Sequence, residues 1–120
     1  MKVAIINVRI IDTKNNIDEV GGILINEKGS IEACGNKITK DNVGDIKIYD
    51  CKNKLAIPGI VDGRVFAGEP GFEYKENYRT LSQAAISGGV TTVVTMPNTN
   101  PIIDNVSTFD FIQRRARDKS

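Results

Sequence analysis

The feature that most constrains the fold is an alternation of apolar, β-branched runs with helix-like stretches in the second half of the chain. Residues 60–66 and 90–96 have the composition of strands that are buried on both faces. Residues 74–87 end at two glycines and residues 106–119 carry arginines near their end, so both are predicted to be helices. The order strand, helix, strand, helix is typical of parallel βα units. A barrel needs about eight such units, and this chain supplies two.

The first half of the chain predicts short strands and no helix. The expected strands cover residues 2–11, 22–26, 31–34 and 46–51. Residues 12–16 are a polar turn, and Glu27-Lys28-Gly29-Ser30 is expected to close a hairpin between the second and third strands. The first fifty-odd residues therefore differ in organisation from those that follow.

Composition excludes several classes of function. The 120 residues carry 16 basic and 15 acidic side chains, a formal net charge of +1, which gives no electrostatic reason to expect nucleic acid or an anionic membrane as a partner. The apolar first residues are interrupted by Arg9 and Asp12, are too short to span a bilayer and lack a signal-peptide cleavage pattern. Cys34 and Cys51 form neither a disulfide framework nor a zinc-ligand cluster. A cytoplasmic protein is the expectation.

The chain contains no histidine. Histidine is the commonest metal ligand and the usual acid–base group at neutral pH. Any mechanism that requires either role must therefore use another residue or another chain.

Four segments of the second half have a distinctive sequence. They are Pro58-Gly59-Ile60-Val61-Asp62, Glu69-Pro70-Gly71-Phe72-Glu73-Tyr74-Lys75-Glu76, Gly88-Gly89-Val90-Thr91-Thr92 and Met96-Pro97-Asn98-Thr99. Together they closely resemble the N-terminal part of the dihydroorotase family, which belongs to the metal-dependent amidohydrolase superfamily with hydantoinase and allantoinase. The resemblance is strong from residue 58 to residue 104 and weaker over the early strands.

The resemblance implies an α/β fold with two parts. Residues 1–57 would be the β-rich N-terminal segment of a composite small domain that flanks the barrel. Residues 58–120 would start a TIM-type barrel with its first two βα units, which leaves the barrel incomplete. Chemistry in such barrels occurs at the C-terminal ends of the strands, which here correspond to residues 62–71 and 95–101.

The same resemblance identifies three positions where the family's pattern is broken. Active relatives end the first barrel strand in His-x-His, which binds zinc, and an arginine one residue later pairs with the substrate carboxylate. Zinc lowers the pKa of its bound water to about 7 and so makes a nucleophile, and a guanidinium binds a carboxylate through two hydrogen bonds. The equivalent residues here are Arg64, Phe66 and Gly68. None of these three residues can bind a metal through its side chain, because Arg64 is a permanent cation, Phe66 is a hydrocarbon ring and Gly68 has no side chain. No metal and no catalytic residue is therefore expected.

Asn98 is the one functional residue of the family that remains in this region. The resemblance implies that it contacts substrate, but an asparagine after proline also suits a turn, and both interpretations stay open. For the substituted positions, a structural role is the alternative. Arg64 would pair with Asp62 or Glu69, and Phe66 would fill the core.

Three hypotheses about function follow. The chain is a dihydroorotase-like protein without catalysis, a role in which some homologues act as structural partners of aspartate transcarbamoylase. Alternatively, it is part of an ordinary amidohydrolase of pyrimidine synthesis that uses other ligands, or a truncated product of a larger amidohydrolase. The relatives' carboxylated lysine, further histidines and catalytic aspartate fall later in their chains than residue 120. Replacement of all three positions within an intact motif favours a maintained non-catalytic protein. The strand count predicts an oligomer, a subunit bound to a protein partner, or a fragment of a larger folded protein.

Overall fold

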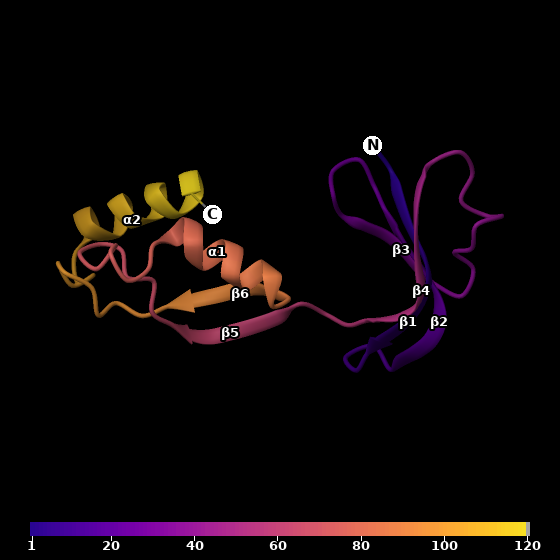
Figure 1. Cartoon of the computed structure of the whole chain (residues 1–120), viewed down its shortest axis with the longest axis horizontal. Coiled ribbons are helices and arrows are strands. Elements are labelled where there is room, and N and C mark those ends of the chain that lie inside the picture. The colour runs from indigo at the N-terminus through magenta and orange to yellow at the C-terminus, as the bar shows by residue number, and fades with distance from the viewer. Residues whose placement is uncertain (120) are drawn as a thin grey trace. The chain divides into compact units, whose positions relative to one another are not determined.

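The computed structural model describes residues 1–119 (Figure 1). In that range the chain forms six strands and two helices. They are β1 (Val3–Asp12), β2 (Ile17–Ile25), β3 (Ile31–Gly35), β4 (Lys47–Ala56), β5 (Ile60–Val65), α1 (Tyr78–Ser87), β6 (Val90–Thr95) and α2 (Val106–Lys119). These elements divide into two compact units, Met1–Pro58 and a second unit that begins at Gly59. All of the helical structure lies in the second unit.

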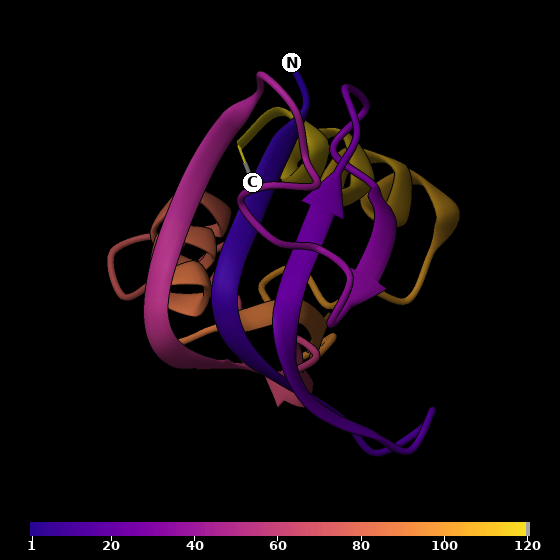
Figure 2. The same cartoon turned by 90° about the vertical axis from the view of Figure 1, so that its right-hand side faces the viewer.

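The first unit is a single sheet with the strand order β3-β2-β1-β4. β1 lies inside the sheet, antiparallel to β2 and parallel to β4, and Figure 2 shows the three strands side by side and strongly curved. Successive side chains of a strand point to opposite faces, and the buried residues of β1 are Ala4, Ile6, Val8 and Ile10. This alternation builds the core of the unit along one strand. Cys34 is exposed, Cys51 is half-buried, and both are free thiols.

β1 and β4 are irregular at facing positions. The pairing register of β1 with β4 shifts between Ile6 and Val8, where Asn7 has a positive φ of 53°. On β4, Lys52 and Asn53 also have positive φ values, 49° and 63°. An extra residue in one strand bends it and increases its twist, so these irregularities account for the curvature of the pair.

β2 is longer than its sequence predicts, since it begins at Ile17 and not at residue 22. Gly21 interrupts the apolar pattern but does not interrupt the strand. A Cβ atom on Gly21 would lie 2.2 Å from the carbonyl oxygen of Gly35, so glycine is needed here for close approach to β3. Asp18, in the extended part, accepts hydrogen bonds of 2.8 Å from Nε and Nη2 of Arg9 on β1. β4 likewise runs past the predicted residue 51 to Ala56.

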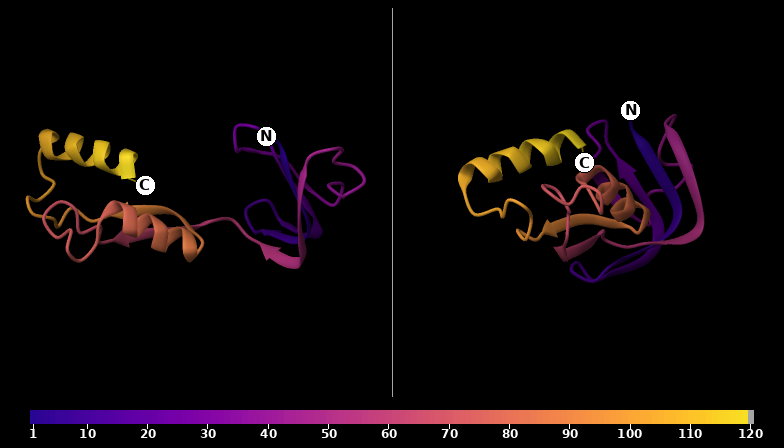
Figure 3. Two further views of the ribbon diagram at one scale, coloured as in Figure 1. Left: turned by 45° about the horizontal axis from the view of Figure 1, so that its top comes forward. Right: turned by 60° about the vertical axis from the view of Figure 1, so that its left-hand side comes forward.

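The second unit consists of a parallel pair of strands, β5 and β6, joined through α1 and followed by α2. Both helices lie on the same side of the strand pair (Figures 1 and 3). α1 begins at Tyr78, four residues later than predicted, because Asn77 caps it by accepting hydrogen bonds from the backbone of Arg79 and Thr80. Neither described helix has the length and apolarity needed to cross a membrane.

The prediction that β5 and β6 are buried on both faces is wrong for this structure. Val61 is 65% exposed and Val94 is 54% exposed. The helices cover one face of the pair, where Ala67, Tyr78 and Ile112 form the buried cluster, and no further described strand pairs with either edge. The apolar side chains of the other face are therefore left in contact with solvent.

Candidate functional site

The end of β5 and the loop after it carry Arg64, Phe66 and Gly68, the three positions that the sequence resemblance singled out. Val65 is half-buried and Ala67 is buried toward the helices, so strand alternation directs Arg64 and Phe66 to the opposite side. Arg64 is exposed, and its backbone N–H donates to Oδ1 of Asp62 at 3.1 Å. Phe66 was expected to fill the core, and this expectation is wrong. Its side chain is 37% exposed, and its ring centroid lies 5.8 Å from that of Phe72.

Gly68 is required by the shape of the loop that follows β5. Its φ is +71°, a conformation that side chains disfavour. A Cβ atom here would lie 2.3 Å from the backbone oxygen of Glu76, and the Gly68 carbonyl accepts a 2.7 Å hydrogen bond from the N–H of Phe72. The loop is folded back onto this glycine, so an arginine at this position would need a different backbone.

These residues do not fit the zinc ion that the family's active members bind. The side chains at positions 64, 66 and 68 offer no lone pair to a metal. Across residues 1–119, no three histidine, cysteine, aspartate or glutamate side chains lie close enough together to hold a metal ion. No step of a metal-dependent reaction can be derived from this end of the strand.

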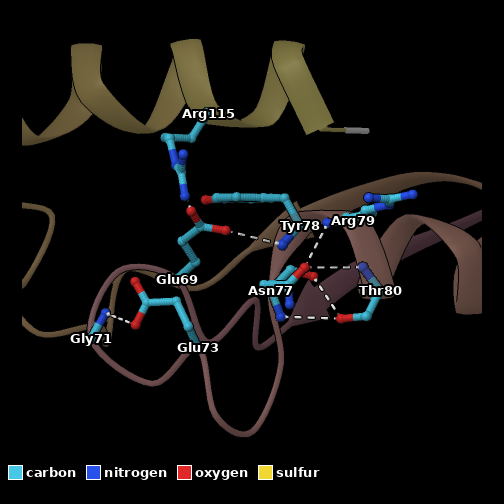
Figure 4. Close-up of polar contacts among 8 residues, drawn as sticks. All are labelled: Glu69, Gly71, Glu73, Asn77, Tyr78, Arg79, Thr80 and Arg115. Carbon is cyan, nitrogen blue, oxygen red and sulfur yellow. Dashed lines mark hydrogen bonds and ion pairs between the residues drawn. The ribbon is translucent and has the colours of Figure 1, made fainter.

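Glu69, the next residue, is the most deeply buried charged side chain that the structure describes, at 1% exposure. Its Oε1 accepts a 2.7 Å hydrogen bond from Nε of Arg115 on α2, and its Oε2 accepts one of 3.3 Å from the backbone N–H of Tyr78 at the start of α1 (Figure 4). A carboxylate at a helix N-terminus is favourable because the unpaired N–H groups point toward it. The sequence suggested Arg64 as a partner of Glu69, whereas the ion pair found here is with Arg115, 46 positions away.

Tyr78 lies beside this ion pair. Its side chain is 6% exposed, and its hydroxyl group is buried without a hydrogen-bond partner among the described residues. Burial raises the pKa of Tyr78 above its usual value, and the negative charge of Glu69 raises it further. The nearby hydroxyl of Thr95 lowers the pKa in part, although its geometry is not that of a regular hydrogen bond. The hydroxyl is therefore neutral at physiological pH, and Tyr78 belongs to the buried cluster with Ala67 and Ile112.

Asn98 lies in the loop after β6, and its side chain is exposed and makes no hydrogen bond to another described residue. The next residue, Thr99, is 4% exposed, and its hydroxyl donates to the carbonyl oxygen of Pro101 at 2.8 Å. The N–H of Asn100 donates to the carbonyl oxygen of Pro70 at 3.0 Å. The structure thus brings the Asn98 loop against the loop after β5, and Asn98 lies in a segment held by these hydrogen bonds.

The structure defines the fold class of the chain, which a solved structure shares. The chain is similar to the L-hydantoinase (dihydropyrimidinase) from Arthrobacter aurescens, with a TM-score of 0.80 over 95% of this chain and 24% of that one. At 24% sequence identity this likeness shows that the two proteins share a fold.

The sequence identifies the family within that class. Residues 53–120 match the dihydro-orotase-like family, and the chain belongs to it. It is 49% identical over 105 residues to the dihydroorotase of Elusimicrobium minutum, covering 88% of this chain and 23% of that protein. It is 40% identical over 117 residues to the dihydroorotase of Ehrlichia canis, covering 95% and 26%. The resemblance predicted from the four segments is confirmed, and the chain spans about a quarter of the length of these relatives.

Proposed function

We propose that this chain is a dihydroorotase-like protein of pyrimidine biosynthesis that does not itself catalyse the family's reaction. That reaction interconverts dihydroorotate and carbamoyl aspartate by opening and closing a cyclic amide. The observation that carries the proposal is the end of β5, where Arg64, Phe66 and Gly68 replace the two zinc-binding histidines and the arginine of active relatives.

The chemistry of these three residues supports the loss of activity. Amide hydrolysis at neutral pH needs an activated water, which the family obtains from zinc. Arg64 would repel a metal cation, and Phe66 offers it no ligand atom. The Gly68 loop also leaves no space for the guanidinium that would hold the substrate carboxylate. Asn98, exposed and without a side-chain partner, is the residue that we assign to substrate contact.

We place the two units in the family's architecture as follows. Residues 1–57 form the N-terminal segment of a composite small domain, and residues 58–120 form the first two βα units of a TIM-type barrel that this chain leaves incomplete. The order β5-α1-β6-α2 and the parallel pairing of β5 with β6 support this assignment, as does the likeness to the hydantoinase.

An alternative role is that of a structural partner of aspartate transcarbamoylase. The exposed apolar side chains of Ile60, Val61 and Val94 favour a role in association. A second alternative is a truncated form of a larger amidohydrolase. Copurification with purified aspartate transcarbamoylase at defined concentrations distinguishes the two, because only the first requires a stoichiometric complex.

The activity assay tests the central proposal. The purified 120-residue chain is incubated with dihydroorotate and, separately, with carbamoyl aspartate, with the Elusimicrobium minutum dihydroorotase as the positive control. We expect no conversion above a control without protein, and no rescue in the Arg64→His, Phe66→His double variant. Conversion above that control that disappears in Asn98→Ala would refute the proposal.

A further inference from the structure

A buried carboxylate in the loop after β5 ties that loop to both helices. Glu69 is anchored on two sides: Nε of Arg115 donates to its Oε1 at 2.7 Å, and the backbone N–H of Tyr78 donates to its Oε2 at 3.3 Å (Figure 4). The Glu69 side chain is 1% exposed, while that of Arg115 is 41% exposed. A buried charge that is held by a cation and a helix N-terminus has little freedom to move, because leaving this position would break interactions that compensate for its burial.

The residues directly after Glu69 make the contact to the second loop. The carbonyl oxygen of Pro70 accepts the N–H of Asn100 at 3.0 Å. Gly71 has a φ of +95°, and a Cβ atom there would lie 2.1 Å from the carbonyl oxygen of Asn100. The two backbones therefore touch, and the N–H of Gly71 is held by Oε2 of Glu73 at 2.9 Å on its other side.

Asn98 is two residues from this contact and is fixed within its own loop by Thr99, whose hydroxyl contacts the carbonyl oxygens of Pro97 and Pro101. The Pro70–Asn100 hydrogen bond ties this loop to the loop that carries Glu69. We propose that Glu69, clamped by Arg115, is the positioning residue that sets the place of the Asn98 amide. The proposal rests on the proposed function only where it treats Asn98 as a substrate contact.

Amide hydrogen exchange on the ¹⁵N-labelled 120-residue chain tests this positioning role. Arg115→Gln removes the cation but keeps the helix, and we expect it to speed exchange of the Asn100 N–H by about tenfold or more, since a hydrogen bond to a charged group is among the stronger ones. Glu69→Gln should act in the same direction, and the side-chain amide resonances of Asn98 should shift in both variants. Arg114→Gln, on the same helix but directed at the backbone of Asp110, is the matched control and should change neither signal.

A second amide separates positioning from general destabilisation. The N–H of Met96 donates to the carbonyl oxygen of Val65 at 2.8 Å, at the end of the β5–β6 pair. A positioning role predicts faster exchange at Asn100 with Met96 unchanged. Equal acceleration at both amides, or an unchanged Asn100 and Asn98 in folded Arg115→Gln, would overturn the proposal. If Arg115→Gln does not fold, Arg115→Lys, which keeps the charge without the Nε hydrogen bond, gives the same comparison. No substrate is present, so the outcome is independent of whether the chain has activity.

Discussion

A Cβ atom placed on Gly68 would lie 2.3 Å from the backbone oxygen of Glu76, eight residues later in the same loop. With a φ of +71° at Gly68 as well, any side chain here meets both a clash and an unfavourable backbone conformation. We expect Gly68→Arg to lower the free energy of unfolding by more than about 2 kcal/mol and not to create a carboxylate-binding site. Urea unfolding followed by circular dichroism measures the first effect. Gly63→Ala is the control, since a Cβ atom at Gly63 meets nothing within 4 Å; equal stability of the two variants would show that the loop is not closed on Gly68.

The cap of α1 gives a second prediction about stability. Oδ1 of Asn77 accepts hydrogen bonds from the backbone N–H groups of Arg79 and Thr80, at 3.1 and 3.2 Å. Asn77→Ala leaves these donors without that partner and should cost about 1 kcal/mol of unfolding free energy. Gln83→Ala, at an exposed position within the same helix, should be close to neutral because alanine is the best helix former. A loss in the Gln83 variant as large as that in the Asn77 variant would argue against the cap.

The metal content of the chain follows from its ligand set. With no histidine in the sequence and no cluster of potential ligands in the described residues, the purified, tag-free protein should hold no stoichiometric zinc after dialysis. Inductively coupled plasma mass spectrometry measures this directly. Zinc that survives dialysis at one equivalent would mean that other residues form a site.

Acid should weaken the first unit. Hydrogen bonds from Arg9 hold the pKa of Asp18 below its ordinary value, and the side chain of Asn15 does the same for Asp12. A carboxylate whose pKa is lower in the folded state contributes stability above its unfolded pKa of about 3.9, and that contribution is lost as the pH falls through the folded value. The urea concentration at the unfolding midpoint should therefore decrease when the pH is lowered below about 4. The decrease should be small and salt-sensitive because these groups are exposed.

Two variants test whether the Arg9–Asp18 pair causes the loss of stability in acid. Asp18→Asn should flatten the pH dependence by removing the titrating partner of Arg9. Asp41→Asn, at an exposed carboxylate that accepts no hydrogen bond from a described residue, should leave it unchanged. If both variants respond to acid like the original chain, the Arg9–Asp18 pair does not contribute.

The open face of the β5–β6 pair predicts association. Val61, 65% exposed, and Val94, 54% exposed, lie on strands without an outer partner in the described residues. Unpaired strand edges and exposed apolar surface both favour binding to another chain. Light scattering and thermal melting over a range of concentrations should show oligomers, and Val61→Lys should reduce them more than Ile31→Lys in the first unit. A monomer that unfolds cooperatively at micromolar concentration would contradict this expectation.

Local patterns predicted the order of elements in the second unit well. Both strands and α2 fall within one residue of their expected bounds, because β-branched runs and a periodic helix are strong local signals. α1 begins later than predicted because residues 74–76 lie in a turn before the Asn77 cap. The extensions of β2 and β4 were not predicted. They include Gly21, which the sheet accommodates at a close approach, and Lys52 and Asn53, which it accommodates at a bulge.

Tertiary contacts were beyond what the sequence allowed us to predict. That positions 64 and 66 carry no metal-ligating side chain is visible in the sequence. The Glu69–Arg115 pair is not, because its residues are separated by 46 positions and nearer partners were available. The requirement for glycine at position 68 depends on where the carbonyl of Glu76 lies, and it too emerges only from the folded loop.

The distribution of the cysteines offers an internal reporter. Both free thiols lie in the first unit, with Cys34 exposed and Cys51 half-buried in β4, and the second unit contains none. A maleimide dye will therefore react at once with Cys34, while the rate at Cys51 is set by local opening of the curved sheet. The labelling kinetics of Cys51 follow the opening of one unit in isolation, and a substitution in the β5–β6 unit that alters them would reveal energetic coupling between the two halves of the chain.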